Sequence, residues 1–122
     1  MSIDGGASYN GYISDLTRCF AIGQVQAEFE QIAKIAANAN AAGRAAARPG
    51  IMAGEVDSIT RAVIDQAGYG EFFTHRTGHG IGMESHEAPY IYKENSITLA
   101  PGMAFTIEPG IYLPGRGGVR IE

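Results

Sequence analysis

The segment SIDGGASYNGYISDLTRCFAI, residues 2–22, predicts a β-hairpin. At its centre lies Ser8-Tyr9-Asn10-Gly11, and Asn-Gly favours a tight two-residue turn. If Tyr9-Asn10 forms the loop, Asp4 faces Asp15 directly; if Asn10-Gly11 forms it, Asp15 is the diagonal neighbour of the partner of Asp4. Both registers put the two carboxylates on one face of the strand pair, about 5–8 Å apart.

Two amphipathic helices are expected after the hairpin. Residues 24–47 predict a long helix that ends at Pro49-Gly50, and residues 54–67 predict a second. The side chains expected to face the core are Phe29, Ile32, Ala33 and Ala36 in the first helix and Val56, Ile59, Val63 and Ala67 in the second. From residue 72 the pattern changes to short strands, at residues 72–75, 103–108 and 118–122. The predicted fold class is α+β, with two helices packed on one face of a mainly antiparallel sheet.

Length and composition indicate one globular domain. The chain has 122 residues, of which 45% are apolar and 18% charged, and these values argue against disorder. A net charge of −4 without a basic face gives no reason to expect a nucleic-acid partner. No apolar stretch is long enough for a membrane span, and no secretory signal is recognisable. Cys19 is the only cysteine, so no internal disulfide can form and a cytoplasmic protein is expected.

Further carboxylates lie on the later strands. A period of two places Thr106 and Glu108 on one face of the strand at residues 103–108. In the last strand Arg120 and Glu122 share a face. Taken singly, these residues have structural explanations. Asp4 and Asp15 fit solvated surface aspartates, and an internal salt bridge explains Arg120 and Glu122 equally well.

Three histidines, His75, His79 and His86, fall within twelve positions. His79 stands in Thr77-Gly78-His79-Gly80-Ile81-Gly82, where glycine on both sides lets the backbone come close to whatever the imidazole binds. Beside four candidate carboxylates, this arrangement favours a metal site. One imidazole and four carboxylates suit manganese, iron(II), cobalt or zinc, and are too many ligands for one tetrahedral zinc. They suit two ions roughly 3.5–4 Å apart, which lower the pKa of a bridging water.

Six motifs follow one another along the chain, namely Asp4 to Ala7, Gly11 to Arg18, Thr77 to Gly82, Ser85 to Pro89, Thr106 to Tyr112 and Gly118 to Glu122. In this order they resemble the pita-bread metallopeptidases, the family that includes methionine aminopeptidase, aminopeptidase P and prolidase. The resemblance covers nearly the whole chain and implies a pita-bread fold with a curved sheet.

The resemblance also implies roles for individual residues. The metal ligands would be Asp4, Asp15, His79, Glu108 and Glu122, with Asp15 and Glu122 bridging two ions. Glu108 would also handle the proton of the attacking water. His86 would contact the substrate and help to stabilise the tetrahedral intermediate. His75 and Arg120 are similar to further substrate-binding residues of the proline-specific branch.

Within the family, the sequences of residues 11–18 and of residues 108–122 resemble those of the Xaa-Pro enzymes. The implied activity is that of an Xaa-Pro aminopeptidase or Xaa-Pro dipeptidase, acting on a peptide with proline in the second position. The alternatives are methionine aminopeptidase activity and a non-catalytic binding protein of the same fold. Manganese is the metal expected first, with cobalt, zinc and iron as alternatives.

Members of the family are longer than this chain on both sides. Residues 1–122 are therefore expected to be a partial catalytic domain that lacks the N-terminal part and the final strand. Such a fragment leaves sheet edges and apolar surface uncovered, so self-association into a homo-oligomer is expected. The fragment by itself is expected to have little or no catalytic activity.

Overall fold

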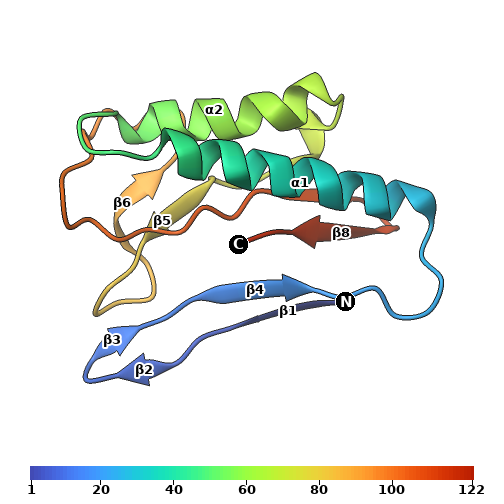
Figure 1. Cartoon of the computed structure of the whole chain (residues 1–122), viewed down its shortest axis with the longest axis horizontal. Coiled ribbons are helices and arrows are strands. Elements are labelled where there is room, and N and C mark those ends of the chain that lie inside the picture. Colours follow the sequence, from blue (N-terminus) through green and yellow to red (C-terminus); the bar gives the residue numbers. More distant parts are fainter.

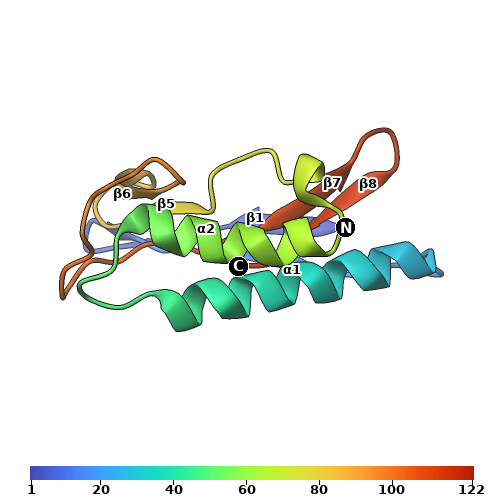
Figure 2. The same cartoon turned by 90° about the horizontal axis from the view of Figure 1, so that it is seen from above.

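Two long helices lie side by side on one side of a set of antiparallel strand pairs, as a computed structural model describing residues 1–122 shows (Figures 1 and 2). The helices are α1, Ala27–Ala46, and α2, Ala53–Gln66, and a short 3₁₀ helix, η1, covers Gly70–Phe72. The strands are β1 (Ser2–Gly5), β2 (Ser8–Tyr9), β3 (Tyr12–Ile13), β4 (Leu16–Cys19), β5 (Gly78–Gly80), β6 (Glu87–Ile91), β7 (Gly110–Leu113) and β8 (Gly117–Arg120). They pair as β1–β4, β2–β3, β5–β6 and β7–β8, all antiparallel. The predicted α+β class is therefore confirmed.

The N-terminal hairpin adopts the second of the two predicted registers. Asp4 lies opposite Thr17 and Tyr9 opposite Tyr12, so Asn10-Gly11 forms the loop. Both loop residues have positive φ, 51° and 84°, as a primed turn requires. This register makes Asp15 the diagonal neighbour of Asp4 across the pair, which places both carboxylates on the same face.

Small residues are among those buried where the two helices pack together. The prediction of which side of α2 is buried is partly wrong. In α1, Ile32 and Ala36 are fully buried, as expected. In α2, Ile59 is 41% exposed and Ala67 is also exposed, while the buried face includes Asp57 and Thr60. Hydrophobic periodicity assigns polar side chains to the outside, whereas these two have hydrogen-bond partners in the interior.

Two apolar clusters attach the strands to the helices. One includes Ile32, Ile64, Phe73, Ile111 and Val119, and the other includes Val56, Ile91, Leu99 and Ile107. Full burial of each large aliphatic side chain stabilises the fold by about 1.5–3 kcal/mol. The later strands β6, β7 and β8 thus turn apolar side chains towards the helices, whereas the β1–β4 pair contributes no fully buried residue to either cluster. Neither helix meets the length and hydropathy that a membrane span requires.

Two of the predicted strands differ from the structure. Residues 72–75 form no strand, because the chain turns through η1 and the N–H of Phe73 donates to the carbonyl of Gly70. A short apolar run such as Phe72-Phe73 does not distinguish a strand from a buried turn. Residues 103–108 contain only an isolated bridge, between Phe105 and Gly80. This segment still runs beside β5, since the N–H groups of Thr106 and Glu108 donate to the carbonyls of His79 and Thr77.

Candidate metal centre

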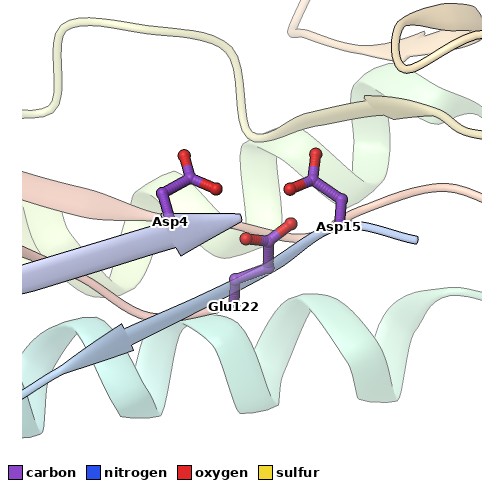
Figure 3. Close-up of side chains that lie close together, drawn as sticks. All are labelled: Asp4, Asp15 and Glu122. Carbon is purple, nitrogen blue, oxygen red and sulfur yellow. The ribbon is translucent and has the colours of Figure 1, made fainter. Parts of the chain in front are cut away.

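Three carboxylates converge where the N-terminal hairpin meets the end of the chain (Figure 3). Asp4 comes from β1, Asp15 directly precedes β4, and Glu122 follows β8. One ligand atom from each lies within 4.8 Å of the others, although the three residues are far apart in the sequence. Asp4 is exposed, while Asp15 and Glu122 are partly buried. Like charges held so close repel one another unless a cation lies between them.

Glu122 is only half satisfied by the protein. The hydroxyl of Thr17 donates to its Oε2 at 2.8 Å, while its Oε1 is buried without a hydrogen-bond partner. Burial raises the pKa of the Glu122 carboxyl above its usual value of 4.5; the Thr17 hydroxyl opposes this shift, and the charges of Asp15, Glu108 and Asp4 add to it. A buried carboxylate oxygen with no donor is a position that a metal ion satisfies.

The imidazole of His79 lies next to two carboxylates, those of Asp15 and Glu108. Its Nδ1 lies 3.0 Å from the carbonyl oxygen of Gly80, and because a carbonyl only accepts, we assign the ring hydrogen to Nδ1. Its Nε2 then lies 3.1 Å from Oε1 of Glu108 and 3.5 Å from Oδ2 of Asp15. A histidine that donates one ring N–H to a main-chain carbonyl and turns the other nitrogen towards acidic oxygens has the usual arrangement of a metal ligand.

Close packing of the backbone brings His79 and Glu108 together. A Cβ on Gly78 would lie 1.9 Å from the carbonyl oxygen of Thr106, so only glycine allows the two chain segments to approach this closely. The hydroxyl of Thr106 donates to Oε1 of Glu108 at 2.9 Å and accepts the N–H of His79 at 3.1 Å. Thr106 therefore fixes both residues, and the predicted sharing of a face by Thr106 and Glu108 is confirmed.

Arg120 lies among the carboxylates, but not in the salt bridge that the sequence allows. It pairs with Asp4, lies 3.9 Å from Oε2 of Glu108, and donates twice to the hydroxyl of Thr17. No ion pair joins it to Glu122. Burial acts to lower the pKa of Arg120, but its interactions with Tyr112, Asp4 and Glu108 outweigh burial and raise that pKa.

The remaining histidines line the open side of this centre. A cleft of about 510 Å³ extends from the hairpin to His79, His86, Glu108 and Arg120. A second hollow of about 480 Å³ shares these four residues and adds His75 and Arg76. The ring centroids of His86 and His79 are 4.0 Å apart, and His86 is exposed to the cleft. Nε2 of His75 lies 2.8 Å from the hydroxyl of Tyr112.

The residues present fit a pair of divalent cations. Asp4, Asp15 and Glu122 form one oxygen-only group, and Nε2 of His79 contacts both Asp15 and Glu108. The carboxylate of Asp15 belongs to both sets of contacts, and the unpartnered Oε1 of Glu122 leaves a further ligand atom available, so this donor set is compatible with two ions.

Some residues of this site were not identified from the sequence. Thr17, Thr106 and Tyr112 each contact a candidate ligand or a candidate substrate residue. Period-two spacing placed Thr106 beside Glu108 without assigning it a role, and the same spacing could have identified Thr17, which shares a face with Asp15. No local sequence signal pointed to Tyr112, because its contact with His75 spans 37 residues.

Comparisons with known proteins agree with this geometry. The model of metallopeptidase family M24 matches residues 1–122. The Xaa-Pro dipeptidase of Lactobacillus delbrueckii subsp. lactis is 49% identical over 119 residues, which cover 98% of this chain and 32% of that protein. The solved structure of a dipeptidase from Pyrococcus horikoshii OT3 superposes with a TM-score of 0.97 at 49% identity, covering 98% of this chain and 34% of the other.

A more distant structure, the methionine aminopeptidase from Rickettsia prowazekii, has a TM-score of 0.82 at 27% identity, covering 97% of this chain and 53% of that one. The chain spans about a third of the length of the curated relatives that it matches. The pita-bread fold expected from the sequence is confirmed by these superpositions. The chain belongs to metallopeptidase family M24.

Proposed function

We propose that this chain supplies the metal centre of a peptidase that hydrolyses the bond between an N-terminal residue and proline. The convergence of four carboxylates and the Nε2 of His79 on one cleft carries this proposal. The names of the relatives at 47–49% identity support the proline preference. Because the chain spans about a third of those relatives, the substrate preference is a property of the whole protein.

Two divalent cations held here would supply a water of lowered pKa and polarise the scissile carbonyl. Asp4, Asp15 and Glu122 would hold one cation, while His79 and Glu108 would hold the other, with Asp15 and Glu122 shared. We place manganese first because most of the ligands are hard carboxylate oxygens, with cobalt, zinc or iron as alternatives.

The protein's own side chains would handle the proton and the developing charge. Glu108 accepts the proton of the attacking water, and its carboxylate is held for this by the hydroxyl of Thr106. His86 lies at the open side of the cleft, where its imidazole can donate to the oxyanion. His75 and Arg120 line the adjoining polar hollow and would bind the substrate.

The surroundings of this centre support two further proposals. The outer face of the β1–β4 hairpin exposes Met1, Ile3, Leu16 and Phe20, each about half or more accessible. We propose that this apolar face supports self-association, which light scattering over a range of concentrations would test; a monomer at high concentration would contradict it. Cys19 has no cysteine partner, which supports a reducing compartment such as the cytoplasm.

The test is a manganese titration followed by an assay of the full-length protein. Xaa-Pro dipeptides, longer Xaa-Pro peptides and Met-peptides would be compared. Cleavage of dipeptides alone indicates a prolidase, and cleavage of longer peptides indicates an Xaa-Pro aminopeptidase. Activity only on Met-peptides would refute the proline preference. Manganese binding without any cleavage would indicate the non-catalytic alternative.

A further inference from the structure

A buried acidic residue lies outside the metal centre, on the helix layer. Asp57 of α2 is fully buried. Its Oδ1 accepts the hydroxyl of Thr77 at 2.7 Å and the main-chain N–H of Thr77 at 3.2 Å. Asp57 also forms an ion pair with Arg61. Such a buried pair adds little net stability to a fold, because the desolvation of the two charges costs about as much free energy as their attraction gains. The contacts of Asp57, above all those with Thr77, therefore indicate its function better than its contribution to stability does.

Arg61, one turn later on α2, extends the same unit. Its guanidinium pairs with both carboxylate oxygens of Asp57, at 3.2 Å and 3.3 Å. It also donates to the carbonyls of Phe73 and His75, at 2.8 Å and 2.9 Å, and lies 4.1 Å from the centre of the Phe73 ring. Because the guanidinium of Arg61 is planar and donates to both carboxylate oxygens and both carbonyl oxygens, it fixes the positions of these four acceptors relative to one another.

The segment Phe73–Thr77 is thus attached to α2 at both of its ends. On the other side of that segment lies the metal centre. The carbonyl of Thr77 accepts the N–H of Glu108 at 2.8 Å, and the hydroxyl of Tyr112 holds the imidazole of His75. Thr77 contacts Asp57 on the helix side and Glu108 on the site side, and His79 follows two residues later on β5.

We propose that Asp57 and Arg61 form a positioning unit that sets His75, His79 and Glu108 through the backbone of Phe73–Thr77. These residues act on the site only through others and contact no ligand. The proposal rests on the metal centre described under the proposed function. It adds the helix layer as the element that determines the geometry of that centre.

Threonine variants of the full-length protein test this without leaving a buried charge unpaired, which could unfold an Asp57→Ala variant. Thr77→Val removes only the hydroxyl that Asp57 accepts, and Thr77→Ser restores it. Thr60→Val is the matched control, because Thr60 is equally buried but donates into its own helix, to Val56. Manganese affinity would be measured by calorimetry, and amide exchange of residues 73–80 by mass spectrometry on the metal-free protein.

We expect Thr77→Val to weaken manganese binding about three- to tenfold, less than the roughly 10- to 100-fold loss for a residue bonded directly to a metal ligand, because the Thr77 hydroxyl bonds to Asp57. Amide exchange of residues 73–80 should become faster, Thr77→Ser should reverse both effects, and Thr60→Val should cause neither. Equal manganese affinity and equal exchange in Thr77→Val and Thr60→Val would overturn the proposal. A wild-type protein that binds none of manganese, cobalt, zinc and iron(II) would refute the proposed function, while the exchange measurement would still decide on the positioning unit.

Discussion

Replacing Glu122 by glutamine should have opposite effects on the metal-free and the metal-loaded protein. Glutamine keeps the shape of the side chain and removes one of three negative charges that lie within 4.8 Å of one another. At that separation, two unit charges repel by about 1 kcal/mol in water and about 3.5 kcal/mol at an effective dielectric constant of 20. Because the side chain of Asp4 is 50% exposed and that of Asp15 22% exposed, the lower value is the better guide.

Removing the repulsion between Glu122 and Asp4 and that between Glu122 and Asp15 should then stabilise the metal-free protein by about 2 kcal/mol. Weakening of the hydrogen bond from Thr17, which is charge-assisted only while Glu122 is ionised, offsets about 1 kcal/mol. The free energy of unfolding of the metal-free protein should therefore rise by about 1 kcal/mol. With manganese at 100 times the wild-type Kd, binding stabilises the wild type by about 2.7 kcal/mol. If the variant binds about 100-fold more weakly, this gain falls to about 0.4 kcal/mol.

Urea denaturation followed by circular dichroism, with EDTA or with manganese, measures both effects. Glu94→Gln is a suitable control, because Glu94 is an exposed residue outside the carboxylate cluster. If Glu122→Gln lowered the free energy of unfolding in EDTA by more than about 1 kcal/mol, repulsion among the three carboxylates would be refuted as the dominant effect. Equal stabilisation of wild type and variant by manganese would refute the assignment of Glu122 as a ligand.

Three further results are expected. Because burial raises the pKa of Glu122, manganese affinity should rise with pH until that raised pKa is passed, and the contribution of this group to metal-free stability should fall as pH rises from about 4.5 through it. Calorimetric titrations over a pH series would show the first effect and urea denaturation in EDTA the second; an affinity that is flat with pH would contradict the role of Glu122. Thr106→Val should weaken manganese binding about 10- to 100-fold, since it leaves Glu108 without its hydroxyl donor, whereas unchanged affinity in calorimetry would exclude a positioning role. Gly78→Ala should destabilise the fold by about 1–3 kcal/mol because its Cβ would collide with backbone, while Gly5→Ala, which meets no atom within 4 Å, should change stability by about 0.5 kcal/mol or less; similar urea midpoints for the two variants would show that β5 can shift.

Local chemistry accounts for the parts of the fold that the sequence predicted. Asn10-Gly11 supplies the positive φ values of a primed turn, and that turn determines which residues of the hairpin lie opposite one another. The placement of Asp4 and Asp15 on one face followed from period two in either register. Confirmation of the second register required the structure, because Tyr9-Asn10 also satisfies the pattern.

Tertiary contacts explain what the sequence did not predict. The buried face of α2 was misjudged at Ile59, because Asp57 finds Arg61 and Thr77 as partners in the interior. Phe73 was expected in a strand, but its ring packs under the guanidinium of Arg61 after a 3₁₀ turn. Such long-range partners leave no trace in local periodicity, which treats every charged side chain as a surface residue.

The hydrogen bond between Thr17 and Glu122 joins residues 105 positions apart. Contacts of such high sequence separation require closure of a long loop, which slows folding. During synthesis, Glu122 leaves the ribosome after every other candidate ligand of this chain, so a growing chain cannot complete the centre. A candidate metal centre assembled from segments so far apart in the sequence cannot form before the segment that carries Glu122 has been synthesised and folded against the hairpin, so metal binding there would report that the native topology has been reached.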